Sequence, residues 1–448
     1  MRASGPAPLR LLLGSFAALI AVGTLLLLLP WATPPGRPIG FIDALFTATS
    51  AVCVTGLIVR DTGSEFTAFG QAVILVLIQF GGVGIMTFSV LAFSALRRRL
   101  SIVDRALVRQ TLAAVGDWVE VRPLLATVVK FTLAAEAMGA ALLFARWQPE
   151  FGTPAAAWYA VFHAVSAFCN AGFGLWRNSL MEWRGDVVVN AVVIALIVLG
   201  GLGFLVVYEA VSLRFRRRTL SVHSRLVLST TAVLVLAGAV IFAVLEKDAS
   251  LAGLPRTDRV LASLFQSVTC RTAGFNTIDI AALSPATLFF MMILMVIGGS
   301  PSSTAGGIKT TTFAVLVLTA VNRLRHRVHV NVFNRTLSPA SVANALSLAL
   351  AAFATIVVGL FLLLLLEAPD VTAERHGVFI GYLFETVSAL GTVGLSTGAT
   401  ATLTPASRVL IAVLMFVGRL GPLTVAGALA REDQVTDWQY PEEEVLIG

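Results

Sequence analysis

The segment ALFTATSAVCVTGL, Ala44–Leu57, recurs three more times along the chain, and this repetition decides the fold. It aligns without a gap to AVFHAVSAFCNAGF at residues 160–173 and to YLFETVSALGTVGL at residues 382–395. A fourth copy, SLFQSVTCRTAGF at residues 263–275, has one residue fewer before its glycine. Internal similarity of this kind indicates a fold built from tandem units.

The composition places these units in a lipid bilayer. The 448 residues are 57% hydrophobic and 13% charged, and the mean hydropathy of +0.87 excludes an ordinary soluble globule. Apolar runs at residues 11–29, 191–207 and 346–366 approach or exceed the roughly 20 residues that cross a hydrocarbon core. We expect about eight spans, the first of which is a retained helix and not a cleaved signal peptide.

Each copy of the segment lies between two apolar spans. The segment is too short to cross, so it is predicted to enter the membrane as a pore helix of about 10 to 12 residues and to return through its glycine. Each unit then returns to the side on which it began, and all four units share one orientation. The predicted fold class is an all-α membrane protein with four tandem helix, pore-loop, helix repeats in a pseudo-four-fold arrangement around one pore. The predicted units are residues 8–96, 123–214, 226–322 and 338–431, followed by a cytoplasmic C-terminal tail at residues 432–448.

Basic residues follow the even-numbered spans and set the orientation. By the positive-inside rule these loops and both termini are cytoplasmic, in a multi-pass protein of the cell membrane. The net charge of +7 is therefore interpreted as an orientation signal that also faces membrane lipids, and not as a nucleic-acid surface. The clusters are Arg97, Arg98, Arg99, Arg105 and Arg109; Arg214, Arg216, Arg217, Arg218 and Arg225; and Arg323, Arg325, Arg327 and Arg335.

The glycine of each repeat is the residue that a cation path requires. A dehydrated potassium ion needs oxygen ligands in place of water, and rings of backbone carbonyls supply them. Glycine tolerates the positive φ that turns successive carbonyls inward, and the C-terminal ends of the pore helices add partial negative charge. The predicted potassium filter is Val54, Thr55, Gly56, Asn170, Ala171, Gly172, Thr272, Ala273, Gly274, Thr392, Val393 and Gly394.

Other small residues receive a structural interpretation. The GGVG and GGLG stretches lie inside apolar spans and lack the setting of a nucleotide-binding loop, so they are interpreted as helix-packing positions. The three cysteines are too few for a disulfide framework and are interpreted as buried packing residues. These residues are Gly81, Gly82, Gly84, Gly200, Gly201, Gly203, Cys53, Cys169 and Cys270.

The last span of the third unit is interrupted. Apolar TLFFMMILMVI gives way at Gly298 to GGSPSSTAGGIKTTT before the apolar run resumes. Such a segment is costly against lipid, so we expect it to be buried against the pore, where it blocks or lines the path. A kink without a gating role is the alternative. The predicted gate is Gly298, Gly299, Ser300, Pro301, Ser302, Ser303, Thr304, Ala305, Gly306, Gly307 and Lys309.

Charged and polar residues at membrane depth require a specific role. Lys309 is expected either to extend its amine to the membrane surface or to form an ion pair at the cytoplasmic end of the broken segment. Within the pore helices, Asp43 is predicted to cap its helix, and His163, Gln266 and Glu385 to hold the filter from behind through hydrogen bonds. On the long spans, Glu136 is expected to pair with Lys130, and Glu209 with nearby arginines.

These motifs resemble the Trk/Ktr/HKT superfamily of potassium transporters, and within it KtrB, the membrane subunit of the Ktr potassium uptake system. The resemblance rests on VTGL at Val54, NAGF at Asn170, RTAGFNT at Arg271, TVGLSTG at Thr392, GGSPSSTAGGIKTTT at Gly298 and GRLGPLT at Gly418. It implies a short filter lined by the four glycines and an intramembrane loop that acts as the gate. Because relatives with serine in the first loop favour sodium, Gly56 implies potassium.

The resemblance also implies partners and a role for one arginine. The family counterpart of Arg419 lies below the filter, where a fixed positive charge would repel or pace permeating cations. A role in pairing helices is the alternative. Members of the family work with KtrA, a cytosolic ring that binds ATP or ADP. The C-terminus of the membrane subunit contributes to the contact in a homodimer. No covalent cofactor and no metal beyond permeating K⁺ are expected, and a role for Na⁺ stays open.

Two other functions compete with a gated pore. A coupled secondary cation transporter, a Na⁺/K⁺ or H⁺/K⁺ symporter, also uses broken helices, but its repeats are commonly inverted. A membrane enzyme would need a catalytic group, and the sequence offers no HExxH motif, paired carboxylates in one polar cluster or supported triad. We therefore expect a transport protein and not an enzyme.

Overall fold

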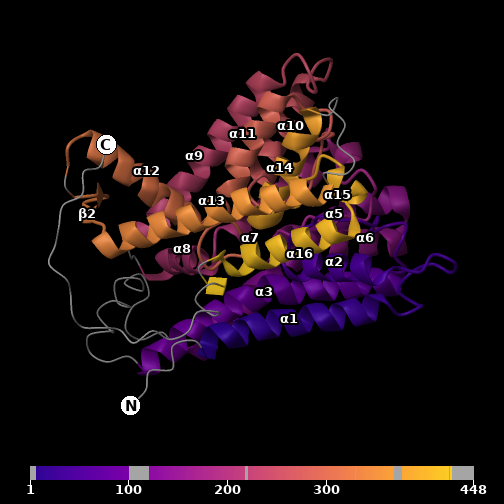
Figure 1. Ribbon diagram of the computed structural model, residues 1–448, viewed down its shortest axis with the longest axis horizontal. Helices are drawn as coiled ribbons and strands as arrows, with labels where there is room; N and C mark the ends of the chain where they lie inside the picture. The colour runs from indigo at the N-terminus through magenta and orange to yellow at the C-terminus, as the bar shows by residue number, and fades with distance from the viewer. Residues whose placement is uncertain are drawn as a thin grey trace.

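The computed structural model describes residues 7–99, 121–216, 220–327, 329–367, 376–422 and 424–425, and these are mostly helical (Figure 1). The elements are α1 (Ala7–Leu27), α2 (Phe41–Val52), α3 (Ala68–Arg99), α5 (Val121–Phe151), α6 (Thr153–Phe168), η1 (Met181–Trp183), α7 (Val187–Gly201), α8 (Phe204–Arg216), α9 (Val222–Leu245), α10 (Arg256–Thr269), α11 (Pro285–Val296), α12 (Thr310–Leu324), β1 (Asn331–Val332), β2 (Arg335–Thr336), α13 (Pro339–Glu367), α14 (His376–Gly391), α15 (Ala399–Thr402) and α16 (Pro405–Leu420). The predicted tail at residues 432–448 and Arg105, Arg109, Arg217 and Arg218 lie outside the described residues.

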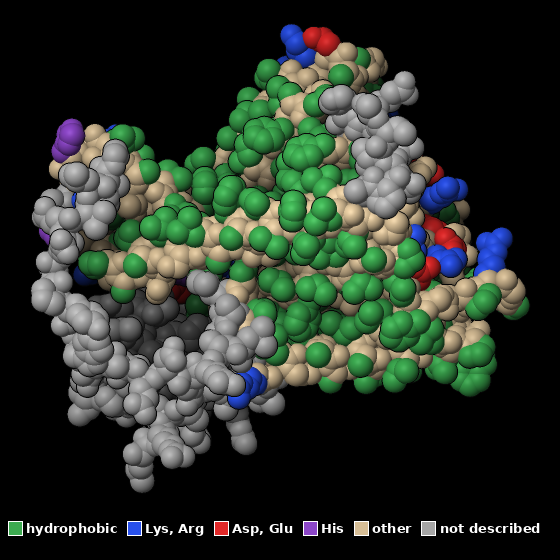
Figure 2. Space-filling model, viewed as in Figure 1, with side chains coloured by type: hydrophobic (Ala, Val, Ile, Leu, Met, Phe, Trp, Pro, Cys, Tyr) green, Lys and Arg blue, Asp and Glu red, His purple; other side chains and the backbone are tan. Residues whose placement is uncertain are grey.

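Length and hydropathy qualify three described helices as membrane spans, namely residues 126–151 of α5, α9 and α13. The bent pair α7 and α8 counts as a fourth if it is one span. Apolar stretches of α1, α3, α11 and α12 are shorter. The expected number of about eight is reached only if α1, α3 and α16 also cross and α11 and α12 together form one broken span. In Figure 1, α1 lies beside α3 and α13 lies beside α16. Figure 2 shows hydrophobic side chains covering this face of the molecule along these helices.

A short helix ends just before each of the four repeated glycines. These helices, α2, α6, α10 and α14, have 12, 16, 14 and 16 residues, so three exceed the predicted length. Each buries a phenylalanine at the same place in the repeat, with at most 1% of its surface exposed. An aromatic ring at this position anchors each short helix in the core. The four are Phe46, Phe162, Phe265 and Phe384.

Carboxylates fasten the helices that follow the pore loops. Asp186 accepts a hydrogen bond from the backbone N of Val189 at the start of α7 and forms an ion pair with Arg146 of α5. Glu246, just past the end of α9, accepts from Ser284 N at the start of α11 (3.1 Å). In the fourth unit, Glu367 accepts from the backbone N of Thr404, the N-cap of α16 (2.9 Å). Negative charge at a helix N-terminus is favourable, so each contact fixes one helix end against its predecessor.

Glycines allow the following helices to touch the ends of the short helices. In the first, second and fourth units a Cβ added to one glycine would lie only 2.0, 1.9 and 2.0 Å from a backbone oxygen near the end of the short helix. Only a glycine permits this approach, which confirms the packing interpretation for two of these positions. The contacts pair Gly81 with Val52, Gly200 with Phe168, and Gly418 with Leu390.

The second unit departs from the prediction of a continuous span. The helices α7 and α8 are bent by 100° where they meet. Gly203 lies at the bend with φ of +83°, a conformation that glycine adopts at little cost. Gly203 also permits close packing, because a Cβ added there would lie 2.4 Å from the backbone oxygen of Pro301. The third unit is therefore not alone in having an interrupted helix.

A second departure is a small β-hairpin after α12, in a chain predicted to be all-α. Asn331 of β1 pairs with Thr336 of β2, and Val332 pairs with Arg335. Phe333 and Asn334 form its turn with φ of +48° and +61°, as a two-residue hairpin turn requires. The hairpin links α12 to α13 and leaves the helical arrangement unchanged.

We expect Gly81→Ala to destabilise the protein by about 1–3 kcal/mol, the usual cost of forcing an extra group into a packed interior. The obstacle is the backbone oxygen of Val52, which moves only with the end of α2. Thermal unfolding of the purified protein in detergent measures the loss. Gly84→Ala is the control, because it lies on the same helix and no described atom lies within 4 Å of its added Cβ, so its predicted packing role finds no support. Equal unfolding temperatures for the two variants would contradict the packing argument.

Candidate functional site

The four repeated glycines come together in a closed ring. A Cβ added to Gly56 would lie 3.0 Å from the Cα of Gly172, and one added to Gly172 would lie 2.8 Å from the Cα of Gly274. From Gly274 the corresponding distance to Gly394 is 3.4 Å, and from Gly394 back to Gly56 it is 3.0 Å. The structure therefore unites the glycines that the sequence singled out, in chain order around one point.

The backbone of these loops alternates in handedness. The glycines have φ of +92°, +70°, +80° and +90°, and the residue two positions earlier is also left-handed, at +55°, +58°, +69° and +50°. Left-handed φ is strained for a side chain, more so for the β-branched Val54, Thr272 and Thr392. Alternation of this kind turns successive peptide planes to the same side, so that polar backbone atoms line one concave surface.

Backbone oxygens lie at the contacts between loops. The added Cβ of each glycine would meet the oxygen of the residue before the next glycine, at 2.4, 2.9, 2.7 and 2.0 Å in chain order. No side chain larger than hydrogen fits there without displacing a backbone atom. The oxygens belong to Ala171, Ala273, Val393 and Thr55.

A hydroxyl residue near the end of each short helix braces the loop that follows, a role that the sequence prediction missed. Its backbone oxygen accepts from the residue before the glycine at 2.7–3.0 Å in all four loops. In the first and fourth loops its hydroxyl accepts from the glycine N at 3.1 Å, whereas in the second and third it donates to the oxygen of the residue after the glycine. The sequence pattern that could have predicted this role is a Ser or Thr six residues before the glycine in three repeats and five residues before it in the shorter third repeat. These residues are Ser50, Ser166, Thr269 and Ser388.

Two of the polar residues predicted to hold the loops from behind do so. His163 accepts from the backbone N of Leu175 through Nε2 (3.3 Å), while its Nδ1 lies 2.8 Å from the oxygen of Tyr159. Glu385 accepts from Ser396 Oγ (2.7 Å) and Thr397 N (2.9 Å). Both fix the chain just after a glycine. These two predictions are confirmed.

The other two polar residues behave differently. Gln266 is buried, and neither its amide oxygen nor its amide nitrogen has a hydrogen-bond partner within the part of the chain that the structure describes. Asp43 does not cap its helix, because Gly40 occupies the N-cap and Asp43 lies inside the first turn. Its carboxylate instead pairs with Arg60 (3.0 Å) and with Arg408 of α16 (2.6 Å). The two predictions are wrong, and Asp43 joins the first unit to the fourth.

The broken segment, residues 298–309, is held against the bent helix of the second unit. Ser300 N donates to Gly201 O (3.0 Å), and Thr304 N donates to Gly200 O (3.2 Å). In return, Phe204 N at the start of α8 donates to Ser302 O (3.2 Å). Each interrupted helix thus supplies backbone partners that the other lacks, which is what irregular backbone at membrane depth requires.

The same segment lies against the base of the glycine ring. A Cβ on Gly306 would lie 2.0 Å from the hydroxyl of Thr392, the residue two positions before the fourth glycine. The hydroxyl of Thr304 donates to the oxygen of Phe168, the last residue of α6 (3.2 Å). The predicted gate residues therefore touch two of the four loops or their helices.

Arg419 and Lys309 both donate to backbone oxygens in this region. Arg419 is 4% exposed, and its guanidinium donates to Thr304 O and to Gly81 O (2.8 Å). It therefore connects α16 to the broken segment and to α3. Lys309 donates through its amine to Ala305 O (2.8 Å), so it closes the segment on itself; the ion pair, one of its two expected roles, does not form among the described residues.

For Glu136 the predicted pairing with Lys130 is wrong, whereas the arginines that follow Glu209 on α8 have side chains outside the described residues. Glu136 is buried and accepts from the amide of Gln79 (3.2 Å), while Lys130 is exposed six residues earlier on the same helix. A six-residue separation places two side chains on different helix faces, so they do not meet. Glu209 accepts from the hydroxyl and backbone N of Ser221, at the start of α9.

Comparisons with known proteins identify the family of the chain. The family described as TrkH, a cation transport protein, matches residues 16–438. The Ktr system potassium uptake protein B of Bacillus subtilis is 39% identical over 98% of this chain and 96% of its own length. The potassium/sodium uptake protein NtpJ of Enterococcus hirae is 37% identical over 98% of this chain and 97% of its own length.

A solved structure agrees at the level of the fold. The potassium transporter TrkH from Vibrio parahaemolyticus superimposes with a TM-score of 0.73 over 94% of this chain and 84% of that one, at 18% sequence identity. The fold is therefore shared even where the sequences have diverged. Taken with the matched family and the full-length relatives, this shows that the chain is a membrane protein of the TrkH/Ktr family of cation transporters.

Proposed function

We propose that this chain is the pore-forming subunit of a potassium uptake system. The observation that carries the proposal is the closed ring of four glycine loops, because alternating left-handed residues can direct backbone oxygens to a common axis. Four repeats then surround one pore, with the twelve predicted filter residues along its narrowest part. Oxygen rings of this kind replace the water around a potassium ion.

The identity of the ion is supported by relatives and by the first loop. Relatives 39% and 37% identical over nearly the whole chain are named for uptake of potassium and of potassium or sodium. Gly56 occupies the position where serine accompanies sodium preference in the resembling family. With only the glycine shared by the four loops, we expect weaker discrimination against sodium than in dedicated potassium channels.

The broken segment at residues 298–309 acts as the gate beneath the filter in this proposal. Its contacts with Thr392 and Phe168 support a position across the path at the base of the ring. Ordinary hydrogen bonds to α7 and one charged donor, Arg419, hold it there, while Lys309 closes the segment on itself. Breaking a few such contacts is a modest cost, so a regulated opening is energetically accessible.

The proposal includes partners and an orientation. A cytosolic ring of the KtrA type, which binds ATP or ADP, would regulate the gate from the side that carries the arginine-rich loops. Two copies of the chain would form a homodimer in the cell membrane with both termini cytoplasmic, each copy having its own pore. The basic loops also suit anionic lipid head groups.

A coupled secondary transporter is the second candidate, and the paired interrupted helices of the second and third units favour it. The distinguishing experiment uses purified protein in liposomes with a potassium gradient and no gradient of sodium or protons. A pore carries potassium current under these conditions, and its reversal potential follows potassium alone. A reversal potential that shifts with sodium or proton gradients in a fixed ratio would favour coupling.

We expect Gly56→Ser to reduce the preference for potassium over sodium by roughly tenfold, or about 1.4 kcal/mol of differential binding. The serine Cβ would lie 2.4 Å from Ala171 O, and φ of +92° strains any side chain, so the ring must widen or tilt. The measurement is rubidium uptake, with competition by sodium and by potassium, in cells that lack their own uptake systems.

Gly36→Ser is the matched control for that substitution. Gly36 also has positive φ (+81°), but no atom lies within 4 Å of its added Cβ. We expect this variant to retain the competition pattern of the unmodified chain. Identical selectivity of Gly56→Ser and Gly36→Ser would rule out the glycine ring as the filter.

We expect Arg419→Gln to raise uptake in the absence of the regulatory partner by about tenfold, because hydrogen bonds from a charged donor contribute about 1.5–3 kcal/mol each. The lost contacts are those to Thr304 O and Gly81 O. Uptake with the activating partner should stay within about twofold of the unmodified chain. If the arginine instead paces ions in the path, the activated flux rises as well.

Arg408→Gln is the control for loss of an arginine from α16. Arg408 pairs with Asp43 and donates to the oxygen of Ala401, away from the broken segment. We expect its uptake without the partner to stay at the level of the unmodified chain. An equal increase in both variants would point to general loosening of α16 and against a specific clamp on the gate.

A further inference from the structure

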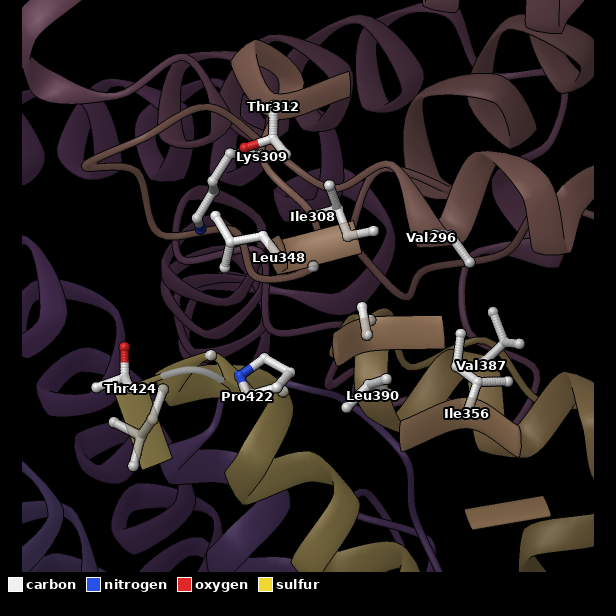
Figure 3. Close-up of a pocket in the computed structure, with 16 residues that line it drawn as sticks. Val296, Ile308, Lys309, Thr312, Leu348, Ile356, Val387, Leu390, Pro422 and Thr424 are labelled. Atoms are coloured by element: carbon white, nitrogen blue, oxygen red, sulfur yellow. The ribbon is translucent and has the colours of Figure 1, made fainter. Parts of the chain in front are cut away.

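A cavity borders the C-terminal part of the broken segment, and none of its lining residues belongs to α7 (Figure 3). Its volume is about 210 Å³, and most of its walls are apolar. Ile308, Lys309 and Thr312 of the third unit form one wall, and Ala352 and Ile356 of α13 contribute to another. In Figure 3, Leu390 and Pro422 lie across the space from Ile308 and Lys309. Interiors are packed to the density of organic crystals, so an opening of this size next to a proposed gate is unusual.

The broken segment has a bound side and an unbound side. Toward the second unit, Ser300 and Thr304 donate backbone hydrogen bonds to the end of α7. On the other side, Gly307, Ile308 and Lys309 border the cavity. Movement toward the second unit would drive the segment into α7. Retreat from the ring therefore leads into the cavity.

The chemistry of the cavity selects an apolar occupant. An engineered apolar cavity of about 150 Å³ stays free of water and binds benzene, and this one is larger. The one charged group in the lining, the amine of Lys309, donates to Ala305 O at 2.8 Å, and the remaining lining is mainly apolar. Apolar groups of a chain or ring fit these walls better than water or an ion does.

The lipid bilayer supplies such a group at this position. The cavity wall on α13 belongs to the helix with the smallest buried share of the three long spans, 17%. Ile356 of the wall is half-buried, and its neighbour Val357 is exposed on the outer face. Lipid chains that cover this face therefore lie directly outside the cavity, next to a wall of the same polarity.

We propose that the cavity binds the end of a phospholipid acyl chain, and that the bound chain holds the gate closed by occupying the space into which the segment must retreat. The proposal rests on the gate function proposed above. It adds a lipid site and a lipid-dependent control to that function. Opening of the gate then requires the acyl chain to leave, so a bound acyl chain and an open gate exclude each other.

We expect Ala352→Phe to reduce rubidium uptake to less than about a tenth of the unmodified value, because its ring fills the cavity permanently. Ala352 is 6% exposed and lines the cavity. Ala354→Phe is the matched control, since it adds the same ring two residues later at an exposed position of α13. Both variants are compared at equal amounts of monodisperse protein. Equal uptake by the two would overturn the proposal.

A shortened gate separates this effect from general damage. Removing residues 302–305 takes away the obstacle that must retreat, so Ala352→Phe should have no further effect on uptake in that background. A tenfold loss of uptake on adding Ala352→Phe to the shortened protein would show that the phenylalanine side chain acts elsewhere, and would overturn the assignment. Failure of the unmodified chain to take up rubidium would count instead against the proposed function.

The lipid itself is tested without any flux measurement. The unmodified protein is placed in liposomes of phosphatidylcholine that carries a diazirine at the end of one acyl chain, irradiated and digested for mass spectrometry. We expect label on Ile308 and Thr312 in addition to exposed residues such as Phe353 of α13. Ala352→Phe should remove the first label and keep the second. Label confined to the exposed face in the unmodified protein would overturn the lipid site.

Discussion

The structure depends on the absence of side chains at four points. Where the repeated glycines meet, an added Cβ would lie 2.0–2.9 Å from a backbone oxygen of the neighbouring loop, so the loops can close a ring only as glycines. The four short helices, with their buried phenylalanines, aim chain ends at this ring. Further glycines let the following helices press against three of those ends. The close approach of backbones at the ring thus continues outward as close packing of helices.

The ring is not four-fold in its supports. Hydroxyls of the first and fourth units accept from the glycine itself, whereas those of the second and third donate to the next residue, so the ring divides into two halves. The second and third units are also the two whose following helices are interrupted. Backbone groups released by one break are satisfied by the other, which lets both breaks exist at membrane depth. A single broken helix would have left those groups without partners.

Much of this was accessible from sequence, because repetition and glycine have direct geometric meaning. The repeats, the meeting of Gly56 with its counterparts and the interruption after Val296 all follow from residue pattern. Pair contacts across units were not accessible, since nothing local links Asp43 to Arg408. The bend at Gly203 escaped because an apolar run with glycines reads equally well as a packed helix. Its partner, the broken segment, is about a hundred residues away in sequence.

The position of the broken segment decides how it can respond to regulation. It is bonded to α7 through Gly200 and Gly201, to α6 through Phe168, and to α16 through Arg419. Arg419 in turn donates to Gly81 of α3, so helices of the other three units all reach the segment directly or through one side chain. A rigid shift of any of these helices changes the geometry of at least one contact. Because each contact is weak singly and they share one short segment, small displacements delivered from different sides can add at the same point. A gate held in this way needs no large motion of the ring itself, whose closely packed glycines leave little room for any.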